Sequence, residues 1–590
     1  MLIKLTIDNQ TVEVPSGTTI LEAARKIGIK ISTLCYLEGI NEIGACRVCV
    51  VEVKGVRNLV ASCVTPVSEG MVVFTNSPAV RASRRVTVEL LLSNHPRECQ
   101  TCPRNLNCEL QALAESLGLR GVRFEGERTH FPVDRSSPAI VRDPQKCILC
   151  RRCVAVCEKV QGVRAISPQG RGFDTVIAPF FQDELANVAC VLCGQCVLVC
   201  PTGALVEADS TAQVWAALAD PRKHVVVQTA PAVRVSIGEM FGLPPGSVAT
   251  GQLVAALRRL GFDRVFDTDF AADLTIMEEG HELLERLERG GTLPMITSCS
   301  PGWIKFIEHF YPQLLPHLST CKSPQQMFGA LAKTYYARKM GLSPKDIFVV
   351  SIMPCTAKKF EETRPEMRSS GYQDVDAVLT TRELGRMLKQ AGIDLKSLPA
   401  EEYDAPLGIS TGAAVLFGAT GGVMEAALRT AYEVKTGKTL TNLNFMGVRG
   451  LEGVKEAEVD LDGLRLRVAV AHSLSQARKL MDRLASGQAD YHFIEIMCCP
   501  GGCIGGGGQP IPTTAVIRQK RSEGIYAADE GMAIRKSHEN PAVQALYKEF
   551  LGRPLSQKSH ELLHTHYKAR GVYPVSGVPL FGVAPGAGDR

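Results

Sequence analysis

The sequence predicts a multidomain protein of the α+β and α/β classes, in which small cysteine-rich domains precede one larger α/β domain. Three observations lead to this prediction. The chain has 590 residues, 45% of them apolar, which is too long for a single hydrophobic core. Fifteen of its 21 cysteines lie within the first 200 residues, in three spaced groups. After residue 210 cysteines become rare, and strand-like runs alternate with helix-like ones, as is typical of a largely parallel sheet.

Residues 1–80 predict a β-grasp domain with a metal-binding loop. Apolar and polar residues alternate from Ile3 to Ile7 and again at Val12 and Val14, and Pro15-Ser16-Gly17 turns into a helical stretch over residues 18–26. The cysteines that follow have the spacing C-x10-C-x2-C with a fourth further on, a longer first loop than the plant-type C-x4-C-x2-C. Four thiolates on one loop system still suit a 2Fe-2S cluster. Its expected ligands are Cys35, Cys46, Cys49 and Cys63.

Residues 81–138 contain a histidine and three cysteines with the spacing His95-x3-Cys99-x2-Cys102-x5-Cys108. Three cysteines leave a 4Fe-4S cube one ligand short. A lone histidine near cysteines is more often an ordinary surface or core residue than a ligand. Because His95 lies at loop distance before the three cysteines, we expect all four residues to bind one 4Fe-4S cluster.

Residues 139–210 contain two copies of the run C-x2-C-x2-C-x3-C, which wraps three corners of a 4Fe-4S cube. In two-cluster ferredoxins the fourth cysteine of each run ligates the other cube, so Cys200 should complete the Cys147 cluster and Cys157 the Cys190 cluster. Zinc or disulfides are the alternatives, and two tandem runs disfavour both. The eight expected ligands are Cys147, Cys150, Cys153, Cys157, Cys190, Cys193, Cys196 and Cys200.

Composition excludes some partners and membrane insertion. Sixty-six basic and 61 acidic residues leave a net charge of +5 without a long like-charge block, so neither nucleic acid nor an anionic membrane is an expected partner. Residues 1–8 have neither an apolar signal region nor a twin-arginine motif, and we expect a cytoplasmic protein. The longest apolar stretch, 188–206, carries four cluster-spaced cysteines with Gly194 and Pro201, which suit a cluster loop better than a bilayer helix.

Residues 211–512 predict an α/β domain in which four strands each end in an unusual loop. Strand 225–228 leads to Ala230-Pro231, 293–296 to Cys299, 347–352 to Met353-Pro354-Cys355, and 493–496 to Met497-Cys498-Cys499. Ligands of open α/β sheets bind beyond the carboxyl ends of the strands, so these loops should converge on one buried site. A glycine run is more often a flexible loop, but Gly505 to Gly508 would also let the backbone pass close to a bulky inorganic group.

Three loop signatures give the chain a family resemblance. They are Thr297-Ser-Cys-Ser-Pro-Gly-Trp303, Met353-Pro-Cys-Thr-Ala-Lys-Lys-Phe-Glu361 and Glu495-Ile-Met-Cys-Cys-Pro-Gly-Gly-Cys503. With the cysteine groups before them, they resemble five-cluster cytoplasmic FeFe-hydrogenases, and most closely the catalytic subunit of NADP-reducing multisubunit hydrogenases. The stretch 559–567 resembles the small-subunit segment of this family, and residues 513–590 are expected to form it.

The resemblance implies an H-cluster between two lobes, in addition to one 2Fe-2S and three accessory 4Fe-4S clusters. The H-cluster is a 4Fe-4S cube joined to a di-iron unit that bears carbon monoxide, cyanide and a dithiolate. Cys355, Cys499 and Cys503 would hold the cube, while Lys358 and Ser323 would donate to the cyanides. The pocket would be lined by Ala230, Pro231, Pro324, Met353, Phe417 and Met497. From the residues alone, Met353, Phe417 and Met497 would be interpreted as core packing.

The resemblance also implies a proton relay. Glu279, Glu282 and Arg286 stand at positions i, i+3 and i+7, so they share one face of a helix, which by itself more often indicates a solvated face. With Ser319 and Cys299 they match the relay from solvent to the di-iron unit.

Two positions depart from the family. Ala232 replaces a serine that is common near a cyanide, which should only tune hydrogen bonding. The first signature usually has two adjacent cysteines, and here Ser300 replaces the second. The fourth ligand of the cube is therefore open between Cys299, the better iron ligand, and Ser300, which has the matching register and would leave the open iron to its oxygen or to a water.

The expected function is reversible oxidation of H2, with electrons passing through the accessory clusters to a redox partner. No nucleotide-binding fingerprint is evident, so we expect separate diaphorase-type flavin/NAD(P) subunits and a small 2Fe-2S subunit, with ferredoxin as a further partner if the complex bifurcates electrons. The alternatives are a stand-alone ferredoxin hydrogenase and a hydrogenase-like iron-sulfur protein in sensing or assembly. A further alternative, the iron-sulfur large subunit of a respiratory dehydrogenase, has the same layout of cysteine groups as the first 200 residues but lacks the three signatures.

Overall fold

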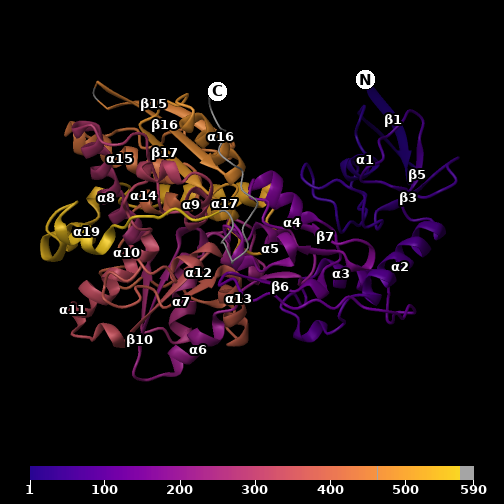
Figure 1. Cartoon of the computed structure of the whole chain (residues 1–590), viewed down its shortest axis with the longest axis horizontal. Helices are drawn as coiled ribbons and strands as arrows, with labels where there is room; N and C mark the ends of the chain where they lie inside the picture. The colour runs from indigo at the N-terminus through magenta and orange to yellow at the C-terminus, as the bar shows by residue number, and fades with distance from the viewer. Residues whose placement is uncertain (462, 572–590) are drawn as a thin grey trace, which may run out of the picture.

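The chain forms an arm of small domains beside a larger body (Figure 1). The computed structural model describes residues 1–461 and 463–571. We call residues 1–210 the arm and residues 211–571 the body. In Figure 1 the arm is the indigo and purple part, with the N-terminus at its far end. The end of the expected small-subunit-like segment, residues 572–590, lies outside the described residues.

The arm begins with a five-stranded sheet of order β2-β1-β5-β3-β4. Its strands are β1 (Leu2–Ile7), β2 (Gln10–Pro15), β3 (Val50–Val53), β4 (Val60–Ala61) and β5 (Val72–Phe74). Strands β1 and β2 form an antiparallel hairpin, and β1 pairs parallel with β5. Helix α1 (Ile20–Lys26) begins at Thr19, whose side chain and that of Glu22 form a capping box. The alternating apolar residues point into the core beneath α1.

The rest of the arm consists of short elements between cysteine loops. They are α2 (Pro78–Ser93), α3 (Glu109–Ser116), β6 (Ile140–Arg142), α4 (Arg152–Ala155), β7 (Ser167–Gln169), β8 (Val176–Ala178), α5 (Gln195–Val199) and β9 (Leu205–Glu207). The two cysteine runs fold alike, because Leu149 and Leu192 both have a left-handed backbone, as do Arg151 and Gly194. The apolar stretch 188–206 is divided between α5 and β9. Among the described residues, no helix has the length and apolar character needed to cross a membrane.

The body contains two four-stranded sheets. The first has the order β11-β10-β13-β14 and is parallel throughout. The second has the order β12-β17-β16-β15 and is parallel except for the hairpin of β15 and β16. The strands are β10 (His224–Thr229), β11 (Arg264–Asp267), β12 (Met295–Ile296), β13 (Ile347–Met353), β14 (Ala377–Thr380), β15 (Val454–Leu461), β16 (Leu464–His472) and β17 (Phe493–Met497). Each sheet supplies a neighbouring pair of the four strands expected to end at the site.

Helices surround and separate the two sheets (Figure 1). The long helix α8 (Thr268–Arg289) packs against α10 (Pro324–Leu331) and α15 (Gly422–Thr436), and most of its residues are buried. The C-terminal helix α19 (Gln557–Leu563) packs against α10. The other helices are α6 (Thr211–Ala219), α7 (Thr250–Leu260), α9 (Pro301–Phe310), α11 (Ala337–Met340), α12 (Ala357–Glu361), α13 (Thr381–Gln390), α14 (Gly412–Val415), α16 (Leu474–Ala485), α17 (Ala515–Glu530) and α18 (Pro541–Leu546).

Candidate functional site

A cavity lies where the carboxyl ends of four strands from both sheets meet. About 780 Å³ of space without protein atoms lies among its lining residues, part of it open to solvent. The loops after β10, β12, β13 and β17 all contribute to its wall, which is the convergence that parallel strands allow. Of the expected pocket residues, six line it: Ala230, Pro231, Pro324, Met353, Phe417 and Met497. The surface that the wall exposes is mostly apolar, and its polar side chains besides the thiols are Lys358, Thr268, Ser300 and Gln325.

Three thiols, those of Cys355, Cys499 and Cys503, face this cavity together. Burial, followed by the neighbouring thiolates, raises the pKa of Cys503 to about 12 and that of Cys355 further. Thiolates so close together in an apolar wall are stabilised when they bind a metal, because the metal supplies the compensating positive charge. The donor set and the room in the cavity therefore fit an iron-sulfur cube with an attached group.

The glycine run Gly505 to Gly508 packs tightly instead of forming a flexible loop. A Cβ on Gly506 would lie 2.1 Å from the carbonyl oxygen of Pro354, and one on Gly507 would lie 2.3 Å from that of Cys193. The close neighbours of Gly506 and Gly507 are protein backbone, although Gly506 also lines the cavity. The run brings the cavity against the last cysteine loop of the arm.

Lys358 and Ser323 meet at one carboxylate beside the cavity. Lys358 Nζ donates to Glu361 Oε2 at 2.9 Å and to the Cys299 carbonyl at 3.3 Å. Ser323 is not part of the described cavity wall, and its hydroxyl donates to Glu361 at 2.8 Å. Lys358 thus reaches the cavity wall, whereas the Ser323 hydroxyl points to Glu361.

The expected relay residues form a buried path that leads away from the cavity. Cys299 lines the cavity. Burial raises the pKa of its thiol, and the charge of Glu279 on α8 raises it further. Glu279 is 1% exposed, and neither of its carboxyl oxygens has a hydrogen-bond partner among the described residues. Burial raises the pKa of Glu279 to about 8, although the nearby Ser319 hydroxyl opposes the shift. A carboxyl with this pKa exchanges a proton readily near neutral pH.

The path continues from Ser319 to the surface end of α8. The Ser319 hydroxyl donates to Glu282 Oε2 at 3.1 Å, and Arg286 Nη2 donates to Glu282 Oε1 at 2.6 Å. Arg286 also donates to the carbonyl of Leu318 at 2.7 Å. The five residues Cys299, Glu279, Ser319, Glu282 and Arg286 therefore occur in the order that a relay requires.

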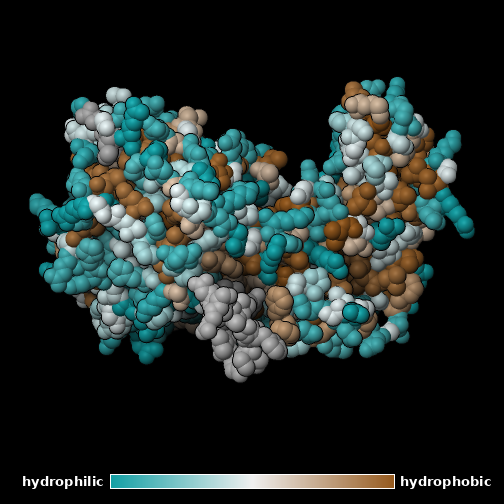
Figure 2. Space-filling view, turned by 45° about the horizontal axis from the view of Figure 1, so that its top comes forward, coloured by the Kyte–Doolittle hydropathy of each residue, from teal (hydrophilic) through white to brown (hydrophobic). Residues whose placement is uncertain are grey.

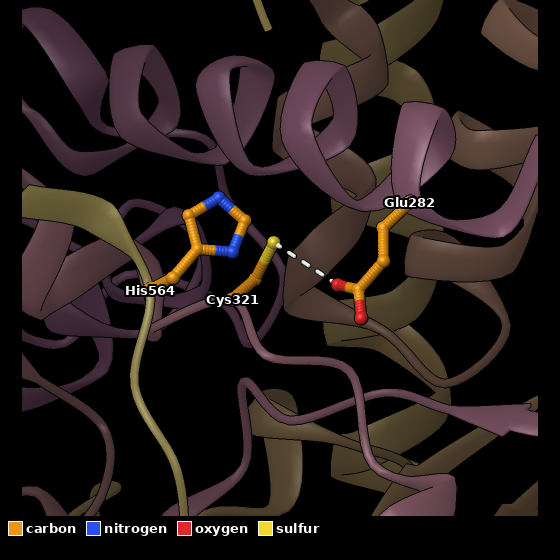
Figure 3. A group of neighbouring side chains, drawn as sticks. All are labelled: Glu282, Cys321 and His564. Atoms are coloured by element: carbon orange, nitrogen blue, oxygen red, sulfur yellow. Dashed lines mark hydrogen bonds between the residues drawn. The ribbon is translucent and has the colours of Figure 1, made fainter. Parts of the chain in front are cut away.

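A second group of side chains branches from Glu282 (Figure 3). Cys321 Sγ lies 4.0 Å from Glu282 Oε2, and His564 approaches from the C-terminal segment. His564 Nδ1 lies 2.8 Å from the Thr320 hydroxyl, and its Nε2 lies 3.1 Å from Glu278. Ligand atoms of Glu282, Cys321 and His564 lie within 4.8 Å of one another, close enough for a metal site. Because Glu282 already accepts bonds from Arg286, Ser319 and Thr320, we interpret the group as a hydrogen-bonded support of the path.

Two cavities in the arm collect the eight cysteines of the tandem runs. One is lined by Cys147, Cys150, Cys153 and Cys200, and the other by Cys157, Cys190, Cys193 and Cys196. In each case the fourth cysteine comes from the other run, as in two-cluster ferredoxins.

A further cavity brings His95 together with Cys99, Cys102 and Cys108. His95 is 9% exposed, and its Nδ1 is buried without a hydrogen-bond partner among the described residues. Burial and the charge of Lys146 lower the pKa of His95 to about 4, so its imidazole is neutral, which is the form that binds a metal. The unpartnered nitrogen fits a fourth ligand.

The four cysteines of the first domain also gather at one place. Cys49 Sγ and Cys63 Sγ lie 3.3 Å apart, and the backbone amide of Cys46 donates to Cys35 Sγ at 3.5 Å. A hydrogen bond from Cys35 lowers the pKa of Cys46 to about 5 against the effect of burial. Four thiols in this arrangement fit a 2Fe-2S cluster.

Hydrogen bonds connect these sites in sequence. Asn41 Nδ2 donates to the carbonyls of both Cys35 and Cys150, at 2.7 and 3.0 Å. The loop after Cys108 bonds through the Glu109 amide to the Pro201 carbonyl at 2.9 Å. At the other end of the arm, Thr356 donates to the Leu192 carbonyl and Gln195 to the Gly505 carbonyl, which joins the arm to the cavity of the body.

Sequence reasoning missed several residues of these sites. Of the 21 cysteines, it gave no role to Cys321 or Cys498. Two cysteines left over in a chain whose other cysteines all had a role were the signal that could have revealed them. Cys498 lines the large cavity beside Cys499. Asn41 stands in no motif, and His564 lies in the small-subunit-like stretch 559–567 but was given no role, because each acts on a loop far away in the sequence.

Family models cover most of the chain. Residues 223–507 match the C-terminal domain of the iron-only hydrogenase large subunit, and residues 515–570 match the iron hydrogenase small subunit. In the arm, residues 1–78 match a 2Fe-2S cluster binding domain, residues 84–123 the NADH-ubiquinone oxidoreductase-G iron-sulfur binding region, and residues 146–204 a 4Fe-4S dicluster domain.

Whole-chain relatives agree with these matches. The chain is 54% identical to the NADP-reducing hydrogenase subunit HndD of Solidesulfovibrio fructosivorans, over 96% of this chain and 99% of that one. It is 44% identical to iron hydrogenase 1 of Clostridium pasteurianum, over 93% and 97% of the two chains. The solved structure of apo HydA1 from Chlamydomonas reinhardtii is 50% identical with a TM-score of 0.55, covering 61% of this chain and 99% of that one. With the iron-sulfur arm and the thiol-lined cavity, these matches show that the chain belongs to the FeFe-hydrogenase family.

Proposed function

We propose that this hydrogenase exchanges electrons between H2 and NAD(P) through separate partner subunits, with ferredoxin as a further partner if the complex bifurcates electrons. The observation that carries the proposal is the continuous route through the chain. The proton path of α8 ends at the thiol-lined cavity, and the bonded cysteine loops of the arm begin there.

The cavity residues hold and shield the H-cluster in this proposal. Cys355, Cys499 and Cys503 bind its cube, and the bound group supplies the iron chemistry that cleaves H2 heterolytically. Met353, Phe417 and Met497 exclude water from it. Lys358 places a positive charge at the wall, where it stabilises anionic ligands of the iron.

Protons leave the cavity along the α8 path. Cys299 receives a proton at Sγ, and Glu279 takes it up because its raised pKa allows both protonation states near neutral pH. Ser319 then carries the proton between Glu279 and Glu282, since a hydroxyl both donates and accepts. Arg286 orients the Glu282 carboxylate toward Ser319.

Electrons leave the cavity through the arm. We assign four accessory clusters to it: a 2Fe-2S cluster in the N-terminal β-grasp domain, a His95-ligated cube and two ferredoxin-type cubes. The bonds of Asn41 and Glu109 join the first two to the ferredoxin-type pair. The arm is therefore a fork, with two outer clusters connected to a common inner pair and through it to the H-cluster.

The surface of the arm favours docking of partner subunits. Of the twenty exposed large hydrophobic residues described, thirteen lie within residues 1–181. Figure 2 shows brown side chains gathered over the arm. The relative HndD is named as a subunit of an NADP-reducing hydrogenase. Diaphorase-type flavin/NAD(P) subunits and a small 2Fe-2S subunit in the cytoplasm would dock at the outer clusters and reduce the nicotinamide.

Purified chain with its H-cluster tests this assignment. Alone, it should reduce a viologen dye with H2 but not NAD(P)+, and adding the partner subunits should start nicotinamide reduction. Direct reduction of NAD(P)+ by the single chain would contradict the partner proposal. An assembly or sensing protein would show no hydrogen-deuterium exchange, and the Cys503→Ala variant provides the inactive reference.

A further inference from the structure

The first signature leaves the fourth ligand of the H-cluster cube open, because it offers Ser300 where the family usually has a cysteine. Three cysteine ligands leave one iron of a cube open. Ser300 occupies the position of the usual cysteine, and Cys299 lies at the start of the proton path beside Glu279. Among the described residues, the cavity wall contains one more thiol of the body that has no role in the path, that of Cys498.

Strand register places Cys498 opposite Ser300. Strands β12 and β17 pair in parallel, with Met295 opposite Phe493 and Ile296 opposite Ile494. Four residues further along both chains, the partners are Ser300 and Cys498. The backbone amide of Cys498 donates to Ser300 Oγ at 3.2 Å, which confirms that the two positions remain neighbours beyond the sheet. A thiol moved from position 300 to position 498 would thus stay at the same corner of the cavity.

The Cys498 sulfur lies at the first turn of α9. It is 2.6 Å from the place that a Cβ on Gly302 would take, so the absence of a side chain there makes room for it. Ser300, the N-cap of α9, makes no side-chain capping bond to the helix.

Its neighbours also suit a ligand of this cube. The Cys498 thiol lies beside those of Cys193 and Cys499. Cys193 belongs to the adjoining arm cavity, which already has four cysteines. The cavity of Cys355, Cys499 and Cys503 is the one that needs a fourth thiol. A thiolate is also a far better iron ligand than the hydroxyl of Ser300.

We propose that Cys498 Sγ is the fourth protein ligand of the H-cluster cube, in place of residue 300. The proposal builds on the function proposed above, since it assumes that the cube sits at Cys355, Cys499 and Cys503. The cysteine has moved from the loop after β12 to the facing loop after β17. Cys299 then remains free for proton transfer, and Ser300 positions the Cys498 backbone.

The test uses the full chain expressed without maturation factors, so that it carries the cube but no di-iron unit. Five clusters without the di-iron unit amount to about 18 irons. Cys498→Ala should lose between about one and four of them, as the cube opens or is lost. The electron paramagnetic resonance signal of the H-cluster cube should disappear, while the signals of the arm clusters persist. Cys299→Ala and Ser300→Ala should keep the full iron content and the cube signal.

A rescue variant separates ligation from structural damage. Cys498→Ala combined with Ser300→Cys returns a thiol to the facing position, and it should restore the iron content and the cube signal. After addition of the di-iron unit, it should also give the infrared bands of bound carbon monoxide and cyanide that Cys498→Ala lacks. Failure of the double variant to restore the cube would contradict the proposal.

Cys355→Ala distinguishes failure of this proposal from failure of the proposed site. If Cys355→Ala loses the cube and Cys498→Ala keeps it unchanged, only the assignment of Cys498 is wrong. If both variants keep the cube signal, the cube lies elsewhere, and both proposals fail. Loss of the cube in Cys299→Ala or Ser300→Ala, with an intact cube in Cys498→Ala, would transfer the ligand role to that residue.

Discussion

Glu279 combines deep burial with two oxygens that lack a hydrogen-bond partner among the described residues. Its pKa of about 8 lies well above the ordinary 4.5, chiefly because burial disfavours the charged form. The folded chain therefore keeps a proton that the unfolded chain releases. As the pH rises from about 4.5 to about 8, the free energy of unfolding should fall, since the unfolded state binds fewer protons in this window.

Glu279→Gln removes this titration while keeping a neutral side chain of the same shape. The fall in stability between pH 6 and pH 9 should become smaller in the variant than in the parent chain, as measured by unfolding midpoints at the two pH values. Turnover should drop roughly 100- to 10,000-fold because proton transfer is lost. Glu285→Gln, at a half-exposed position of the same helix, is the control. An unchanged pH dependence of stability in Glu279→Gln would contradict the assigned pKa.

Cys498 shows which site residues the sequence could reveal. The spacings of the cysteine groups in the arm are enough to predict iron-sulfur ligands, and the three signatures identify Cys355, Cys499 and Cys503. Cys498 stands inside the third signature without an assigned role, and only the pairing of β12 with β17 and the bond of its amide to Ser300 Oγ show that it faces Ser300. The partner of Ser323 was also hidden, because Glu361 at the end of α12 meets it only after α10 and α12 fold together.

At the scale of elements, the prediction succeeded for strands and fell short for sheets. Apolar runs with distinctive loops identify β10, β12, β13 and β17 and their order. They do not show that these strands divide between two sheets, since hydrogen-bonded pairing joins residues far apart in sequence. The helix with Glu279 and Glu282 was recognisable from its spacing, but its burial depends on α10 and α15 packing over it.

The C-terminal segment stabilises the loop that carries Ser319. His564 bonds the Thr320 hydroxyl and Glu278, and the Thr565 amide donates to the Thr320 carbonyl at 2.7 Å. His564→Ala leaves the buried Glu278 short of a partner, so it should cost about 1–3 kcal/mol in the free energy of unfolding. Hydrogen exchange at the Cys321 and Lys322 amides should also become faster.

The exposed His566 provides the matched control for this prediction. His566→Ala should leave both the unfolding free energy and the exchange rates of the 320–322 loop unchanged. Equal effects of the two substitutions would mean that the segment does not act through His564.

Gly507 determines how closely the body approaches the arm. In Gly507→Ala the new Cβ would lie 2.3 Å from the Cys193 carbonyl oxygen and 2.6 Å from Gly194 Cα, so backbone must move. The expected cost is about 1–3 kcal/mol or more, measured as a lower unfolding midpoint. Gly126→Ala, where a Cβ meets nothing within 4 Å, should be neutral. A neutral Gly507→Ala would show that the two loops are not tightly packed.

At the scale of the whole molecule, Asn41 connects the outer 2Fe-2S domain to the inner clusters. Asn41→Leu keeps a similar volume but removes both hydrogen bonds to Cys35 and Cys150. It should keep its full iron content, while the 2Fe-2S cluster becomes reduced more slowly after mixing with H2. Freeze-quench electron paramagnetic resonance measures that delay. Asn58→Leu, an exposed change in the same domain, should leave the kinetics unaltered.

The bond from Asn41 has a consequence for the kinetics of the enzyme. Because it fixes the first cysteine loop to the ferredoxin-type domain within one polypeptide, the spacing of those redox centres does not depend on collision between molecules. Internal transfer is then a first-order event, independent of enzyme concentration and of solvent viscosity. Only the last step, from the outer clusters to another subunit, remains sensitive to how much partner the cell provides.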